Sequence, residues 1–265
     1  MNKDSTLLFK QDSHGIATIT LNRPDKYNAF TKDMIIGWAG LLEKCESDPD
    51  IKVIVLTGAG KAFCSGGDIN AQKERANNDS LERKDFLFRH VHKIAFIMER
   101  MDKPTIAAIN GTARGAGLDM ALMCDLRVMA DTATVAESYI NVGLIAGDGG
   151  TYYLPRIIGV PRALELFWTG RAVGAVEAER IGLVNSVAPL DKLMEVTYEL
   201  ARQIAGQPFE AIRAYKRSVY QGMNMTLGAH LDMVSSHTSI LRDTPDHRAK
   251  VAAFLDRKNR LNSPN

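Results

Sequence analysis

Thr105-Ile-Ala-Ala-Ile109 is a run of mostly β-branched and small apolar residues, and it leads into the glycine-rich turn Asn110-Gly-Thr-Ala-Arg-Gly-Ala-Gly117. The next residues, Leu118-Asp-Met-Ala-Leu-Met123, begin a helical pattern. An earlier stretch has the same order, with Val53-Ile-Val-Leu-Thr57 leading into Phe63-Cys-Ser-Gly-Gly-Asp-Ile69. This repeated strand, turn and helix predicts a mixed α/β fold.

The two glycine-rich turns also suggest a function. The first N–H groups of a helix have no partner within the helix, so each turn can direct backbone N–H groups at a negative oxygen. If the two turns converge, their N–H groups form an oxyanion hole for a carbonyl that becomes an enolate or a tetrahedral anion. We therefore expect the active site to lie where these turns meet.

Composition excludes several classes of protein. The chain has 265 residues, of which 45% are apolar and 24% charged, and its formal charge is +2. These values are ordinary for a globular protein and do not predict a nucleic-acid or membrane partner. The three cysteines are far apart and show no metal-ligand spacing, so we expect no metal site and no disulfide. With no apolar signal region at the N-terminus, we expect a cytoplasmic location.

The hydrophobic pattern divides the chain in two. Residues 1–188 are expected to form an α/β core that opens with a hairpin of Leu7–Gln11 and Ile16–Leu21. Thr31 is expected to cap a helix, and a polar helical stretch is expected from about Asp79 to Met101. Residues 189–265 are expected to be a helical appendage that packs on the core, on another subunit, or on both. Three appendage residues on one helix face are expected to serve packing: His230, Met233 and His237.

Several side chains near the turns could carry chemistry. Asp119 lies in the first turn of a helix, where it either complements the helix dipole or acts in a reaction. Asp148, between two glycines, is either a helix N-cap or a base on a loop that a ligand approaches closely. Asp68 also fits an N-cap. Tyr139, close to Glu137, either packs or donates a hydrogen bond. Neither turn fits a dinucleotide fingerprint or a P-loop.

Several motifs in order make the chain resemble the crotonase superfamily, typified by enoyl-CoA hydratases and isomerases. They are Leu21-Asn-Arg-Pro-Asp-Lys-Tyr-Asn-Ala29, Ala62-Phe-Cys-Ser-Gly-Gly-Asp68, Ala108-Ile-Asn-Gly111, Ala121-Leu-Met-Cys-Asp125, Gly149-Gly-Thr151, Leu154-Pro-Arg156 and Ala178-Glu-Arg-Ile-Gly-Leu-Val184. The resemblance implies a spiral of ββα units with a C-terminal helical region used for trimerisation. It also implies homotrimers that often pair into hexamers, and an acyl-CoA substrate whose coenzyme A is the only cofactor-like group.

The resemblance also assigns site residues. It implies an oxyanion hole formed by backbone groups of the Ser65–Gly67 turn and of Ala116. Contacts to the CoA thioester are implied for Lys26, Ala29 and Asp68, together with the turn residues Ser65, Gly66 and Gly67. The two glutamates of family hydratases match Asp119 and Tyr139, so the usual hydratase pair is incomplete. Some relatives, including isomerases and a ring-closing synthase, carry an acidic residue on the loop of Asp148.

These residues favour proton transfer at a carbon next to, or conjugated with, a thioester carbonyl. Asp148 would move the proton and Asp119 would assist, in hydration or double-bond isomerisation of an enoyl-CoA, as in fatty-acid metabolism. An acyl-CoA hydrolase and a ring-forming or ring-opening enzyme are the alternatives. RNA binding and an idle assembly partner are two further alternatives, although the helix predicted over residues 31–47 offers only Lys32 and Lys44 as lysines for RNA. The sequence does not identify the acyl group.

Overall fold

The computed structural model of the chain describes residues 5–68 and 79–262. The helical pattern expected after Asp68, and the expectations for the first four and last three residues, lie outside the described residues. Within the described ranges, no helix combines the length and the apolar character needed to cross a membrane.

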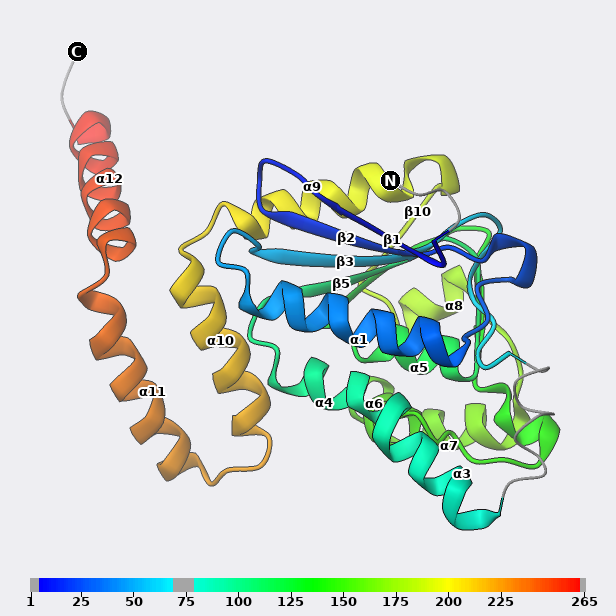
Figure 1. Cartoon of the computed structure of the whole chain (residues 1–265). Helices are drawn as coiled ribbons and strands as arrows, with labels where there is room; N and C mark the ends of the chain where they lie inside the picture. The colour runs from blue at the N-terminus through cyan, green and yellow to red at the C-terminus, as the bar shows by residue number, and fades with distance from the viewer. Residues whose placement is uncertain (1–4, 69–78, 263–265) are drawn as a thin grey trace. The chain divides into compact units, whose positions relative to one another are not determined.

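A six-stranded sheet forms the centre of the first part of the chain (Figure 1). Its strand order is β1-β2-β3-β5-β7-β10. The strands are β1 (Leu7–Gln11), β2 (Ile16–Leu21), β3 (Val53–Gly58), β5 (Thr105–Ile109), β7 (Leu126–Ala130) and β10 (Ser186–Ala188). The β1–β2 pair is antiparallel, which confirms the predicted hairpin, and the other pairs are parallel. The two apolar stretches that precede the glycine turns therefore form neighbouring strands, β3 and β5.

A second, smaller sheet contains the strands that directly follow β3, β5 and β7 in the chain. Its order is β4-β6-β8-β9. The strands are β4 (Ala62–Cys64), β6 (Thr112–Arg114), β8 (Thr134–Ala136) and β9 (Val173–Gly174). Thus β3 continues into β4, β5 into β6 and β7 into β8, and β6 is followed by helix α5 (Ala116–Leu122). This succession is the predicted ββα unit, and it brings residues of β4, β6 and β8 together at the end of the large sheet.

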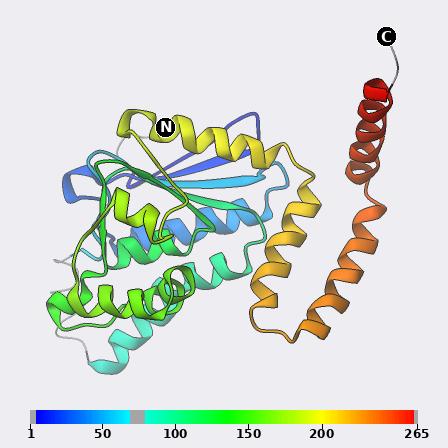
Figure 2. The same cartoon turned by 180° about the vertical axis from the view of Figure 1, so that it is seen from behind.

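Helices cover both faces of the large sheet (Figures 1 and 2). Helix α1 (Lys32–Ser47) lies on one face, and its N-cap is Thr31, whose side chain accepts a hydrogen bond from the Met34 amide, as predicted. The apolar face of α1 is buried, including Trp38, which is 2% exposed. Helix α9 (Leu193–Ala205) lies on the other face, and a hydrogen bond of 2.9 Å joins the Tyr198 hydroxyl to Thr18 of β2.

The polar stretch after residue 79 is helical, as predicted. It consists of α3 (Ser80–Phe86), a π-helical turn (Leu87–Val91) and α4 (His92–Arg100). Asp79 caps it in a capping box with Glu82. The chain later forms a short 3-10 helix (Ser138–Val142), α6 (Gly150–Ile158), α7 (Val160–Thr169) and α8 (Ala175–Arg180). Helix α7 has Pro161 in its first turn, a position with which proline is compatible.

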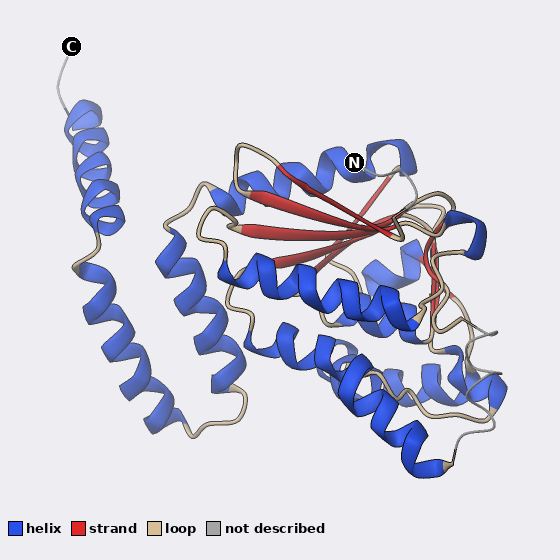
Figure 3. Ribbon diagram, viewed as in Figure 1, coloured by secondary structure: helices blue, strands red, loops and turns tan. Residues whose placement is uncertain are grey.

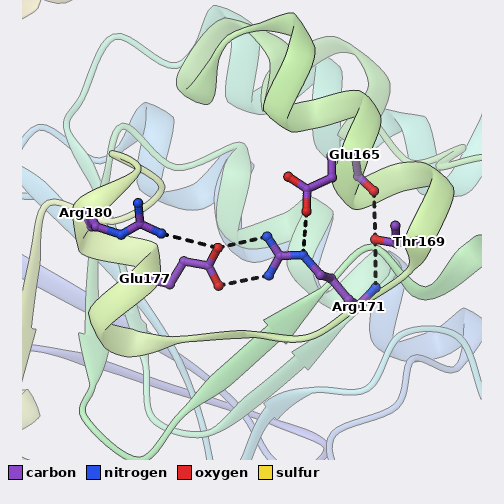
Figure 4. A network of polar contacts seen from close by, with 5 residues as sticks. All are labelled: Glu165, Thr169, Arg171, Glu177 and Arg180. Atoms are coloured by element: carbon purple, nitrogen blue, oxygen red, sulfur yellow. Dashed lines mark hydrogen bonds and ion pairs between the residues drawn. The ribbon is translucent and has the colours of Figure 1, made fainter.

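Arg171 fixes the connection between α7 and α8 (Figure 4). Its guanidinium makes two hydrogen bonds of 2.9 and 2.8 Å to Glu177 and one of 2.7 Å to Glu165. Arg180 adds a longer contact of 3.7 Å to Glu177. The Glu177 pair is a bidentate Arg–carboxylate contact, which fixes geometry better than a single contact does. Because these side chains remain partly exposed, we expect the network to orient the turn more than it stabilises the fold.

The chain forms two compact units, Met1–Gln203 and Ile204–Asn265. The second unit contains α10 (Phe209–Gly222), α11 (Leu227–Arg242) and α12 (Pro245–Asn262), and its described residues are helical or in turns (Figure 3). Most of α9 belongs to the first unit, and its residues Leu193, Thr197 and Ala201 are buried. The division at residue 188 follows the change of sequence pattern, and as a domain boundary it stays a prediction.

Candidate active site

The two glycine-rich turns are in contact. Gly117, in the first turn of α5, lies so close to the Cys64 carbonyl that a side chain at this position would overlap it. A side-chain carbon added to Gly66 would lie 3.6 Å from the Ala116 nitrogen. Gly66 and Gly115 have φ values of 93° and 48°, a region that favours glycine. The glycines therefore allow the backbone of one turn to approach the backbone of the other.

The backbone amides of these turns differ in what they bind. The Ser65 amide donates to the Tyr27 carbonyl at 3.0 Å, and the Gly66 amide points to the Cys64 sulfur at 3.3 Å. Ser65 is thus not available as a donor to a ligand, and we assign it no oxyanion contact. Among the residues that the structure describes, none accepts a hydrogen bond from the Ala116 amide. Gly67 and Ala116 stay the predicted pair of donors.

The segments predicted to contact CoA lie beside the first turn. Phe30 and Gly67 form a bridge, in which the Phe30 amide donates to the Gly66 carbonyl at 2.8 Å and the Asp68 amide donates to the Phe30 carbonyl at 3.0 Å. This bridge places buried Ala29 close to Asp68. The Asp68 carboxylate pairs with Arg23 at 2.9 Å. Lys26 is exposed at the end of a 3-10 turn (Pro24–Lys26) in the same loop.

Asn28 holds this loop in place, and the sequence analysis gave it no role. Its side chain is fully buried, and its amide nitrogen donates to the carbonyls of Ala59, Ala62 and Phe63 at 3.0, 2.8 and 3.2 Å. Its side-chain oxygen accepts from the Arg23 amide at 2.8 Å. Asn28 also has a φ of 57°, which asparagine tolerates better than most residues. That combination is the signal that could have identified it.

Asp119, Tyr139 and Asp148, the three side chains predicted to be catalytic, lie together in one cluster. The Tyr139 hydroxyl donates to Asp119 Oδ2 at 2.8 Å and lies 3.2 Å from Asp148 Oδ2. The Asp148 amide lies 3.3 Å from Asp119 Oδ2. Asp148 does not cap α6, because the N-cap is Gly149 and no side chain caps that helix. Its carboxylate is instead directed to the phenol of Tyr139.

Burial dominates the electrostatics of this cluster. Asp119 is 0% exposed and Asp148 is 9% exposed. Loss of solvation raises the pKa of both carboxyl groups, and the charge of Asp148 raises the pKa of Asp119 further. Hydrogen bonds from Tyr139 lower the pKa of both aspartates. Burial and the two carboxylates also raise the pKa of the Tyr139 phenol, so it stays a neutral donor.

Two further side chains adjoin the cluster. Glu137 is 1% exposed and lies within hydrogen-bonding reach of Asp119, and burial raises the pKa of Glu137 strongly. His92, the first residue of α4, makes a hydrogen bond of 2.8 Å to the Gly147 carbonyl. Its charge lowers the pKa of Asp148. The sequence pattern places Glu137 close to Tyr139 without indicating a role for it, and it gives no signal for His92.

The histidines of the second unit pack against neighbouring helix residues. The His237 ring nitrogen Nδ1 lies 3.1 Å from the Ser218 hydroxyl, and Gly222 leaves room for the His230 ring. In the part of the chain that the structure describes, no group of three or more His, Cys, Asp or Glu side chains could hold a metal ion.

Comparisons with known proteins identify the chain's family. The sequence model of the enoyl-CoA hydratase/isomerase family matches residues 11–261. YngF of Bacillus subtilis, a protein named for that family, is 35% identical over 255 residues, which is 96% of each chain. The 1,2-epoxyphenylacetyl-CoA isomerase of Escherichia coli is 32% identical over 92% of this chain and 93% of its own.

A solved structure gives the same result for the fold. A crystal structure of an enoyl-CoA hydratase from Bacillus anthracis superimposes with a TM-score of 0.88 at 33% identity, covering 96% of this chain and 97% of that one. The predicted spiral of ββα units is confirmed by this match. The chain belongs to the enoyl-CoA hydratase/isomerase family of the crotonase superfamily.

Proposed function

We propose that this protein moves a proton at a carbon next to, or conjugated with, the thioester carbonyl of an enoyl-CoA, and so shifts its double bond. The amides of Gly67 and Ala116 would hold the thioester oxygen and stabilise the enolate that forms when the proton leaves. Contact between the two glycine turns supports this arrangement, because the Gly66 backbone lies against the Ala116 nitrogen. Family membership supports the acyl-CoA substrate.

Asp148 is the proposed base. Of the two aspartates in the cluster it is the one with a fraction of its surface exposed, 9% against 0% for Asp119. A base works best when its pKa lies near the operating pH, and burial raises the pKa of Asp148 toward that range. Tyr139, a neutral donor, would hydrogen-bond to Asp148 while it is an anion and release it when it takes the proton. A group of this kind contributes about 10²–10⁴-fold to the rate.

The burial of Asp119 is the observation that favours isomerisation over hydration. Hydration in this family uses two carboxylates that act on one water molecule. Asp119 Oδ2 faces the Tyr139 hydroxyl and the Asp148 amide, and Asp119 Oδ1 is buried. A water molecule between Asp119 and a substrate would have to displace these contacts. Isomerisation requires one carboxylate only, because the same group can remove a proton at one carbon and return it at another.

The experiment follows atoms from the solvent. A 3-enoyl-CoA and a 2-enoyl-CoA are incubated with the protein in D₂O and, separately, in water enriched in ¹⁸O. We expect deuterium in the isomerised product and no ¹⁸O. Incorporation of ¹⁸O into a 3-hydroxyacyl product would instead indicate hydration, and ¹⁸O in a free carboxylic acid would indicate hydrolysis.

The Asp148→Asn variant tests the base. Asparagine is close to aspartate in size but cannot accept a proton at neutral pH, so we expect turnover to fall by about 10²-fold or more. Asp191→Asn, at an exposed position in a 3-10 turn (Leu190–Lys192), is the matched control. If Asp148→Asn retains turnover within a few-fold of the parent, Asp148 is not the base. A ring-forming or ring-opening reaction would then be the leading alternative.

We also propose that the protein acts as a homotrimer or a pair of trimers in the cytoplasm, without a nucleic-acid partner. Exposed apolar side chains of the second unit support self-association, among them Tyr215, Val219, Met223 and Leu227. A cavity of about 1050 Å³ lies between α10 and α11 and is lined mostly by apolar surface. Light scattering on the purified protein gives the mass, and a monomer at micromolar concentration would contradict this proposal.

A further inference from the structure

Glu137 is a carboxyl group without a donor. It follows β8 directly, is 1% exposed, and neither of its carboxyl oxygens receives a hydrogen bond from a donor in the described part of the chain. Asp119 Oδ1 is in the same condition. A buried ionised carboxylate without donors is strongly unfavourable, so Glu137, beside an Asp119 oxygen that also lacks a donor, requires an explanation.

Gly150 locates the two groups relative to each other. A side-chain carbon at Gly150 would overlap Asp119 Oδ1 and would lie 3.0 Å from Glu137 Oε1. Both oxygens therefore border the same small space at the start of α6, and the Asp119 and Glu137 carboxyl groups are within hydrogen-bonding reach. One proton between them would give each oxygen the partner that it lacks.

We propose that Glu137 is a positioning residue, held as a neutral carboxylic acid that donates its proton to Asp119 Oδ1, and that Asp119 is thereby fixed as an anion beside Tyr139. Asp119 then has a donor on each oxygen, Glu137 on Oδ1 and Tyr139 on Oδ2. It cannot exchange protons readily, so Asp148 is left as the group that does. This inference deepens the proposed function and rests on it for the role of Asp148.

The position of the proton follows from the surroundings of each carboxyl group. Asp119 accepts from the Tyr139 hydroxyl and lies near the Asp148 and Gly150 amides, all of which favour its anion. Glu137 faces two acidic groups, Asp119 and Asp148, and both disfavour its ionisation. The charge of His92 lowers the pKa of Asp148 and so favours the Asp148 anion. Burial and the charge of Asp119 both raise the pKa of Glu137, in agreement with this placement.

Infrared spectroscopy of the full-length protein without substrate tests the protonation directly. We expect the carbonyl stretch of a protonated carboxylic acid at neutral pH, a shift of this band when glutamate is ¹³C-labelled, and its absence in Glu137→Gln. If the parent protein shows no such glutamate band at neutral pH, the inference is wrong. This measurement requires no activity, so its outcome is separate from that of the proposed function.

Two substitutions test the positioning role. Glu137→Gln retains an N–H donor toward Asp119, so we expect proton exchange within a few-fold of the parent and an unchanged acid limb of the pH–rate profile. Glu137→Met has a similar size but no donor. It should lower kcat about tenfold or more, the effect of one lost hydrogen bond to a charged group, and move the acid limb to higher pH. Equal profiles for the two variants would overturn the positioning role, whatever their stabilities.

Discussion

Replacing Tyr139 with phenylalanine removes one oxygen atom from the centre of the carboxylate cluster. The ring of Tyr139 packs against Gly115, where an added side-chain carbon would lie 3.4 Å from its Cε2, and phenylalanine keeps that ring. The lost hydroxyl donates to Asp119 Oδ2 at 2.8 Å and lies 3.2 Å from Asp148 Oδ2. The substitution therefore removes a hydrogen-bond donor from the site with little change in packing.

The magnitude follows from the two distances. A hydrogen bond to a charged group contributes about 1.5–3 kcal/mol, and a single hydroxyl proton divides this between two carboxylates. The longer contact gives Asp148 the smaller share, about 1 kcal/mol, which corresponds to a little under one pKa unit. Because the Tyr139 hydrogen bond lowers the pKa of Asp148, its removal raises that pKa. The base form is then lost at a higher pH.

The assay is the pH dependence of kcat/KM for deuterium exchange into an enoyl-CoA in D₂O. We expect the acid limb of Tyr139→Phe to lie about one unit above that of the parent, again from the lost hydrogen bond. Tyr198→Phe is the matched control, since it removes a hydroxyl that lies outside the cluster and makes a hydrogen bond of 2.9 Å to Thr18. An acid limb at the same pH in Tyr139→Phe and parent would refute the reasoning.

Other substitutions give simpler expectations. Gly150→Ala should abolish exchange and lower the melting temperature, because its methyl group would overlap Asp119 Oδ1; a calorimetric scan checks the second effect. Glu137→Gln should be more stable than the parent above about pH 5. Folding raises the pKa of Glu137, so the parent loses stability as the pH rises above about 4.3, the pKa of glutamate in the unfolded chain. Urea unfolding midpoints measured against pH test this. Cys64, with a pKa raised to about 12 by burial, should react with thiol reagents only on unfolding. Thr31→Ala should cost about 1 kcal/mol in urea unfolding, with exchange unchanged.

Local sequence signals predicted much of the fold. The hairpin of Leu7–Gln11 and Ile16–Leu21, the cap at Thr31 and the glycine turns each depend on a few neighbouring residues, and all three are as expected. The meeting of the two turns was predictable as well. Both follow neighbouring strands, β3 and β5, that pair in parallel, so the two strands end at the same edge of the sheet.

The parts of the site that sequence did not reveal depend on contacts between distant segments. Glu137 lies near Asp119 because β6 and β8 pair with Arg114 opposite Ala136, a register that no local pattern fixes. His92 reaches Gly147 from a separate helix. The Ser65 amide was a reasonable donor in the sequence, but the Tyr27 carbonyl takes its hydrogen bond from a loop far away in the chain.

Because β3 and β5 are neighbours, the backbone that positions the two glycine turns can be kept while the side chains that carry the chemistry are changed. The peptide groups that follow these strands are located mainly by backbone pairing, between β3 and β5 and between β4 and β6. A library that varies only the side chains at positions 119, 137, 139 and 148 would therefore sample new reactions while keeping the backbone of the proposed oxyanion hole. Glycines at 66 and 117 would have to be kept constant throughout such a library.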